Sequence, residues 1–145
     1  MHEQENYTAQ EFNRLYKELD DLYHEVALKA GISDSELTIL YGACRMGDGC
    51  MQRDVCEQAC ISKQTVHSGI RKLEKEGLLF LEQANGRDKH IYLTDAGKEF
   101  SRQHVCPLAK IEDDAFAGLT SKERRELLRI VRKYVDNFRE LLERS

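Results

Sequence analysis

The chain has 145 residues, a length typical of one domain and too short for two catalytic domains. Hydrophobic residues make up 41% and charged residues 33%, and no apolar run approaches the roughly 18 residues needed to cross a bilayer, which excludes a membrane protein and a disordered chain. One proline and nine glycines in 145 residues favour helices over an all-β sandwich. The formal net charge is −4, although the stretch 52–90 has one more basic than acidic residue.

Two capping boxes mark the starts of the first two predicted helices. Thr8 with Glu11 begins an amphipathic helix over residues 8–29. Ser33 with Glu36 begins a second helix, which should stop before a Gly-Asp-Gly turn. The chain therefore opens with two helices joined by a short turn.

In the middle of the chain the spacing of apolar residues changes from a helical pattern to a β-strand pattern. Residues 52–59 form a short predicted helix, and Ser62 caps a second one over 63–76, which together indicate a helix-turn-helix. The segments 78–83 and 90–94 are β-capable and flank an Asn-Gly turn signal. A β-hairpin directly after a helix-turn-helix indicates a wing.

The C-terminal part is again helical. Thr94 can cap a helix that Pro107 should kink or break, because proline lacks a backbone donor and clashes one turn back. Thr120 with Glu123 forms a third capping box before a last helix, which carries an apolar stripe wider than a short winged helix could cover. Burial of this stripe and of the first helix against a second copy predicts a two-fold homodimer.

These elements predict a mainly α fold with a small β-hairpin wing. Residues 1–145 form a single domain in this interpretation. A winged helix-turn-helix occupies residues 33–94, and the helical segments 8–29 and 95–144 form the dimerisation region.

Three groups of segments carry a resemblance to a known family. They are Ile61–Val66 with Leu73–Leu78, Gly86–Lys89 with Leu93–Gly97, and Phe116–Thr120. In this order and spacing the chain resembles, over nearly its whole length, the MarR-type (multiple antibiotic resistance regulator) winged-helix transcription factors. The resemblance implies a homodimer that binds a roughly palindromic operator and usually represses transcription until an effector is sensed. Asn85 stands where the family usually has Asp, and Phe80 and Leu81 where it often has Arg, which predicts weaker DNA affinity or a looser wing.

Polar side chains fill the first turns of the predicted recognition helix, where a helix in the major groove reads base edges. Gln64 suits a bidentate contact to adenine, and His67 a guanine or a phosphate. Arg87 at the wing tip suits the minor groove. A plain solvated helix face and a solubilising turn are the alternatives. The predicted DNA-binding residues are Ser62, Lys63, Gln64, Thr65, His67, Ser68, Arg71, Lys72, Arg87 and Lys89.

The five cysteines need an explanation other than a disulfide framework. The N-terminus lacks the basic and apolar regions of a secretory signal, so we expect a cytoplasmic protein with reduced thiols. The open alternatives are small buried hydrophobes, oxidant-sensing thiolates, or ligands of a thiophilic metal such as zinc. Cys50, Cys56 and Cys60 are the redox candidates, with Cys50 expected to react first in an exposed loop. No CxxC spacing occurs, and we predict no bound metal and no cofactor.

The resemblance also implies a small-molecule effector, held between the dimerisation helices and the winged helix. Candidate lining residues are Tyr16, Tyr23, His24, Tyr41 and Arg45, with plain packing as the alternative. An enzyme is not predicted, because the sequence has no nucleophile motif, phosphate-cradling glycine loop or HExxH. The predicted function is therefore an effector-responsive repressor that binds double-stranded DNA. A redox- or metal-sensing regulator and a winged-helix protein-interaction module remain the alternatives.

Overall fold

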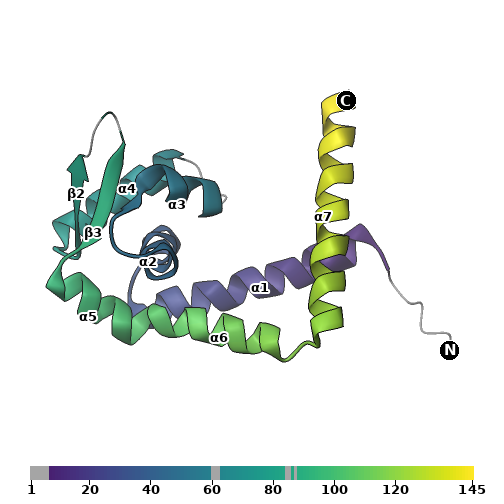
Figure 1. Cartoon of the computed structure of the whole chain (residues 1–145), viewed down its shortest axis with the longest axis horizontal. Coiled ribbons are helices and arrows are strands. Elements are labelled where there is room, and N and C mark those ends of the chain that lie inside the picture. Colours follow the sequence, from purple (N-terminus) through teal and green to yellow (C-terminus); the bar gives the residue numbers. More distant parts are fainter. Residues whose placement is uncertain (1–6, 60–62, 84–85, 87) are drawn as a thin grey trace. The chain divides into compact units, whose positions relative to one another are not determined.

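The computed structural model describes residues 7–59, 63–83, 86 and 88–145. The chain divides into two compact units, Met1–Ala109 and Lys110–Ser145. In chain order the described elements are α1 (Ala9–Ala30), α2 (Asp34–Met46), β1 (Cys50–Met51), α3 (Gln52–Ala59), α4 (Lys63–Lys75), β2 (Leu79–Gln83), β3 (Lys89–Leu93), α5 (Asp95–His104), α6 (Cys106–Ala117) and α7 (Ser121–Arg144) (Figure 1). The predicted helix-turn-helix and hairpin are confirmed.

Local capping explains where the helices begin. The Thr8 hydroxyl accepts a hydrogen bond from the backbone amide of Glu11, as expected for an N-cap. The predicted capping boxes Ser33–Glu36 and Thr120–Glu123 are both complete, with each side chain bonded to the other residue's backbone amide. At the other end of α1, Gly31 adopts φ 73°, a left-handed conformation that glycine adopts without steric cost.

Helix α2 lies at the centre of the first unit, with α4 packed along it (Figure 1). Ile39 and Leu40 of α2 are fully buried, and burying each such side chain stabilises the fold by about 1.5–3 kcal/mol. Gly69 of α4 makes the close approach possible: a Cβ there would lie 2.6 Å from the Ile39 side chain. The spacing between α2 and α4 therefore depends on this glycine.

The three strands form an antiparallel sheet in the order β1-β3-β2. Leu79 and Ile91 are buried on the face towards the helices. On the other face the rings of Phe80 and Tyr92, which are paired across the strands, stack with their centroids 5.5 Å apart. Strand β1, which the sequence analysis did not predict, extends the hairpin into a three-stranded sheet.

The junction of α5 and α6 confirms one prediction and corrects another. The helix breaks at Val105, and Pro107 lies in the first turn of α6, where its missing N–H leaves no hydrogen bond unmade. Cys106 at this junction forms a disulfide with Cys44 in α2, with Cα atoms 5.7 Å apart. The expectation that all thiols stay reduced is therefore wrong for this pair. The two cysteines are 62 residues apart in the sequence, so no local pattern indicates that they pair.

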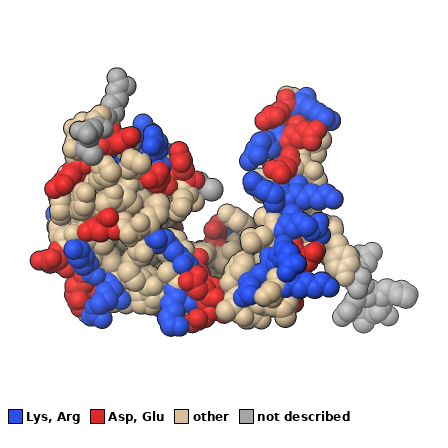
Figure 2. Space-filling model, in the orientation of Figure 1, with Lys and Arg blue, Asp and Glu red and all other residues tan. Residues whose placement is uncertain are grey.

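In the second unit, α7 has no buried residue. Val131 and Val135 are half-buried. The larger apolar side chains of the helix are exposed: Leu127, Leu128, Ile130, Tyr134, Phe138, Leu141 and Leu142. Basic side chains predominate on the face of α7 seen in Figure 2, with acidic ones gathered towards its C-terminal end. Among the helices that the structure describes, none is both long and apolar enough to cross a membrane.

Candidate nucleic-acid interface

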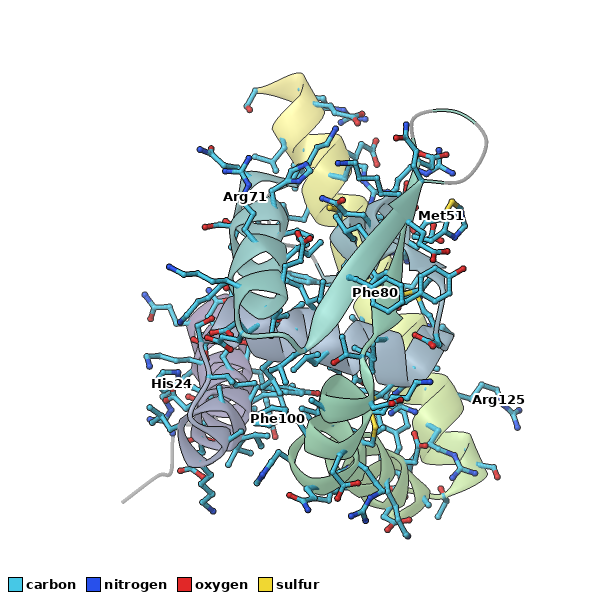
Figure 3. The ribbon with its side chains drawn as sticks, turned by 90° about the vertical axis from the view of Figure 1, so that its left-hand side faces the viewer. His24, Met51, Arg71, Phe80, Phe100 and Arg125 are labelled. Carbon is cyan, nitrogen blue, oxygen red and sulfur yellow. A yellow bond between two sulfur atoms is a disulfide. The ribbon has the colours of Figure 1, made fainter. Side chains whose placement is uncertain are left out.

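Helix α4 has two chemically different sides. Val66, Ile70 and Leu73 are buried on the side that packs into the core of the first unit. A shallow hollow of about 580 Å³ runs along the exposed side. It is lined by Lys63, Gln64, His67, Ser68 and Arg71. Figure 3 shows Arg71 directed away from the body of the protein. All five lining residues are among the predicted DNA contacts, so the fold gathers them on one accessible surface.

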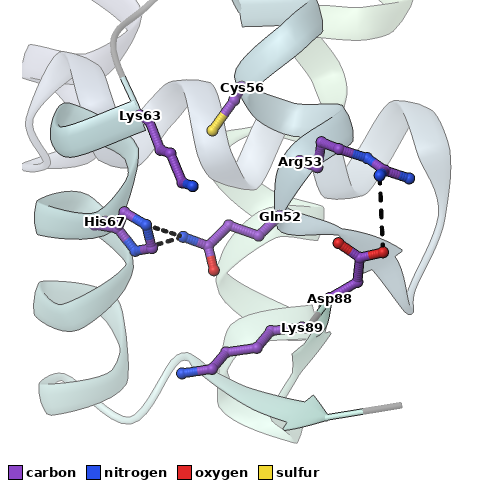
Figure 4. Close-up of a pocket in the computed structure, with 7 residues that line it drawn as sticks. All are labelled: Gln52, Arg53, Cys56, Lys63, His67, Asp88 and Lys89. Atoms are coloured by element: carbon purple, nitrogen blue, oxygen red, sulfur yellow. Dashed lines mark hydrogen bonds and ion pairs between the residues drawn. The ribbon is translucent and has the colours of Figure 1, made fainter. Parts of the chain in front are cut away.

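A second hollow of about 260 Å³ lies between α3, α4 and the hairpin (Figure 4). It is lined by Gln52, Arg53, Cys56, Lys63, His67, Asp88 and Lys89. The buried Gln52 amide nitrogen lies 2.6 Å from Nδ1 of His67, which ties the imidazole of α4 to α3. Arg53 Nη1 lies 3.8 Å from a carboxylate oxygen of Asp88. Cationic side chains therefore extend from α4 to the hairpin.

The roles of Gln52 and Arg53 were not predicted from the sequence. Both lie in the first turn of α3, whose role in positioning α4 is visible only once the two helices are packed. An amide and a guanidinium at the very start of the first helix of the helix-turn-helix were the available signal. Gln52 orients His67, and Arg53 adds a cation beside the hairpin.

The remaining predicted contacts divide into three cases. Thr65 is exposed on α4 outside both hollows. Lys72 lines neither hollow, because its ammonium lies 3.0 Å from a carboxylate oxygen of Glu36 in α2. Ser62 and Arg87 lie outside the described residues.

Comparisons with known proteins identify the fold. No protein-family model and no curated protein matches the chain. A MarR family regulator from Neisseria meningitidis is 16% identical with a TM-score of 0.78, and the match covers 92% of this chain and 95% of that one. The chain has the MarR fold. The predicted fold class, mainly helical with a small wing, is confirmed.

Two further structures with the MarR fold are similar over almost their whole length. Staphylococcus aureus MepR, solved in complex with DNA, is 19% identical with a TM-score of 0.68, covering 92% of this chain and 99% of that one. Bordetella bronchiseptica BpsR, whose DNA binding is regulated by 6-hydroxynicotinic acid, is 20% identical with a TM-score of 0.63, covering 92% and 98%. At these identities the similarity shows a shared fold.

The candidate effector residues are only partly brought together in this MarR fold. Tyr23, His24 and Tyr41 line a hollow of about 490 Å³ in the first unit, and Nδ1 of His24 lies 2.8 Å from a carboxylate oxygen of Asp34. Arg45 donates to the Tyr41 hydroxyl from outside the lining, at 3.0 Å. Tyr16 is exposed two turns earlier on α1 and is not part of the hollow. The other lining residues were not predicted from the sequence; they are Asp20, Asp21, Asp34, Leu37, Thr38 and Leu108.

The redox candidates have different surroundings. Cys50 is half-buried in β1 rather than exposed in a loop, and burial, with smaller contributions from the charges of Asp54 and Asp48, raises the pKa of its thiol. A raised pKa lowers the thiolate fraction and so opposes the expectation that Cys50 reacts first. Cys56 is a free, half-buried thiol in the hollow beside the hairpin. Cys60 lies outside the described residues.

Proposed function

We propose that this protein is a MarR-type transcriptional regulator that binds double-stranded DNA through α4 and the hairpin. The observation that carries the proposal is the hollow on α4, which gathers five of the side chains predicted to contact DNA. A helix with amide, hydroxyl and cationic groups along one accessible side can read base edges while it binds phosphates. The MepR–DNA complex has the same fold.

Each group in this surface has a proposed role. Gln64 contacts an adenine edge, and His67 contacts a guanine or a phosphate from the orientation that Gln52 gives it. Lys63, Arg71 and Lys89 bind phosphates on either side. The proposed contributions of Ser62, Thr65 and Arg87 rest on the sequence alone.

We propose that the regulator is a homodimer, most simply a repressor in the cytoplasm. The apolar side chains Phe12, Leu15, Leu19 and Leu22 of α1 are exposed, as is the apolar stripe of α7. Burial of these surfaces against a second copy gives a two-fold assembly, which matches a palindromic operator. Half-sites about one helical turn apart, roughly 34–36 Å, would place both copies of α4 on one side of the duplex.

A small-molecule effector is the second part of the proposal. The hollow lined by Tyr23, His24 and Tyr41 has the size of a ligand site. Its lining includes the carboxylates of Asp20, Asp21 and Asp34 and no Lys or Arg. Asp21 is paired with Lys17 and Asp34 with His24, so Asp20 is the carboxylate that would bind a cationic or hydrogen-bond-donating ligand. We propose that such a ligand changes the DNA affinity of the dimer.

Salt-titrated binding tests the function. The protein is titrated with duplex from upstream of its own gene, and with a scrambled duplex of equal length and composition. We expect selective binding whose logarithmic affinity falls steeply with logarithmic salt concentration, by about 0.9 per neutralised phosphate. Weak binding without preference would contradict an operator at this locus. Binding of a protein partner with an affinity that does not depend on salt concentration would favour the alternative, a winged-helix protein-interaction module.

A further inference from the structure

We propose that Glu36 and Lys72 form a charged clamp that positions the recognition helix α4, so that Lys72 acts through α2 and not by binding DNA phosphate. This inference rests on the proposed DNA-binding function. The observation behind it differs from the one behind the proposed function: it is the ion pair between Glu36 and Lys72, which joins α2 to α4 in the first unit.

Glu36 is an unusually constrained carboxylate. It is fully buried in the first turn of α2, where one oxygen accepts a hydrogen bond from the Ser33 backbone amide at 3.1 Å. The same oxygen lies 3.0 Å from Nζ of Lys72. A buried carboxylate requires a cation and hydrogen bonds to offset its lost hydration. One side chain therefore holds the start of α2 and the later turns of α4 together.

Lys72 lies on a different side of α4 from the proposed phosphate contacts. It follows Gly69 by three residues, and a Cβ at Gly69 would lie 2.6 Å from the Ile39 side chain of α2, so this side of α4 faces α2. Arg71, the neighbouring residue, lines the exposed hollow instead. Adjacent residues on a helix point about 100° apart, so the two cations serve different surfaces.

A third charged group makes the clamp sensitive to the loss of Lys72. Glu76 lies one turn after Lys72, and burial, followed by the nearby charge of Glu36, raises the pKa of its carboxyl group. The second carboxylate oxygen of Glu36 is buried without a hydrogen-bond partner among the described residues. Removal of the Lys72 ammonium would leave the neighbouring carboxyl groups of Glu36 and Glu76 without the cation that stabilises their charged forms. α4 would then shift, and the angle at which its first turns enter the major groove would change.

A double-mutant cycle tests the clamp without DNA. The variants are Lys72→Met, Glu36→Gln and both together, with Arg71→Met as the matched control on the exposed side. We expect Lys72→Met to lower the midpoint of thermal unfolding by about 10 °C, because it leaves an unpaired buried charge, whereas the double variant recovers at least half of the loss. Arg71→Met should shift the midpoint little. Additive effects of the two substitutions would overturn the clamp.

Salt-titrated DNA binding separates positioning from phosphate contact. Arg71→Met should reduce the salt slope by about 0.9, the value for one lost phosphate contact. Lys72→Met should leave the slope unchanged while affinity falls at every salt concentration, and Lys72→Arg should restore affinity. An equal loss of slope in Lys72→Met and Arg71→Met would overturn the proposal. If Lys72→Met does not fold, a folded double variant with an unchanged slope supports the clamp.

The two measurements also separate this inference from the proposed function. Absence of selective binding by the unaltered protein would contradict the DNA-binding function. The unfolding cycle would still decide whether Glu36 and Lys72 hold α4 in place. Coupling between the two substitutions would support the clamp, and its absence would overturn it.

Discussion

Helices α2 and α7 begin with the same capping motif but differ in how far their apolar faces are covered. The Ser33–Glu36 box begins α2, in which six residues are buried: Glu36, Leu37, Ile39, Leu40, Gly42 and Ala43. The Thr120–Glu123 box begins α7, in which none is buried. Both helices carry apolar stripes, so the difference lies in what covers them. α2 is covered by its own chain, whereas the stripe of α7 remains available for a second molecule.

The largest expected effect concerns the stripe of α7. Phe138→Glu places a charge in the middle of the exposed apolar side chains. It should convert the dimer to a monomer and reduce operator affinity about 100-fold or more, because the two copies no longer bind together. Sedimentation and DNA titration would measure both changes. Lys133→Glu, on the charged side of α7 away from the stripe, is the control and should leave the dimer intact; dissociation by both variants would contradict this use of α7.

A large effect is also expected where α2 is joined covalently to the start of α6. Reduction of the Cys44–Cys106 disulfide removes a cross-link between two residues that are 62 positions apart in the sequence. The loop-entropy relation gives about 4 kcal/mol of lost stability. Urea unfolding with and without reductant, and of the Cys44→Ser variant, measures this loss. Reductant should have no effect on the variant, and equal stability of the oxidised and reduced protein would contradict the cross-link.

A smaller effect is expected on the pH dependence of stability, which should differ between the capping carboxylates Glu36 and Glu123. Burial raises the pKa of Glu36, but hydrogen bonds from Ser33 and Lys72 outweigh it and hold the pKa below its usual value. A folded-state pKa below the unfolded value means that this carboxylate stabilises the protein above the usual glutamate range, and that the stabilisation is lost as pH falls through the lowered pKa. Glu36→Gln should therefore flatten the acid side of the stability profile, measured by urea unfolding at a series of pH values.

Glu123 provides the comparison for this titration. Hydrogen bonds from the backbone and side chain of Thr120 lower the pKa of Glu123, which is exposed. The sign is the same, but water screens the exposed carboxylate, so Glu123→Gln should change the acid profile less than Glu36→Gln. Equal flattening by both variants would show that burial of Glu36 adds nothing.

The smallest expected effect comes from the cap hydroxyls. Thr120→Ala should cost about 1 kcal/mol, because it removes one hydrogen-bond acceptor from the exposed start of α7. Ser33→Ala should cost more, approaching about 2 kcal/mol, because it also disturbs the buried Glu36. Chemical denaturation of the two variants measures the difference. The reverse order would contradict the role given to burial.

Local patterns accounted for most of the secondary structure. Capping boxes, the Pro107 break and the alternation of hairpin residues depend on neighbours in sequence, so they could be predicted without the fold. Lys63, Gln64, His67, Ser68 and Arg71 follow helical spacing, and their grouping on one side of α4 was likewise accessible.

Long-range contacts were not accessible in this way. The Cys44–Cys106 disulfide and the Glu36–Lys72 pair each join segments that meet only after α2 is packed. Glu36 was predicted correctly as a capping residue, but nothing in its local pattern showed that it is buried. Strand β1 is too short to have a period of its own and is defined by its pairing with β3.

Selection of bound sequences from a random duplex pool tests the central claim most directly. The unaltered protein and Gln64→Ala would be compared at the same salt concentration. We expect the unaltered protein to enrich an inverted repeat with half-sites about one helical turn apart, and Gln64→Ala to lose base preference at one symmetric pair of positions. Enrichment of no repeat, or an identical repeat with both proteins, would contradict base reading by this side of α4.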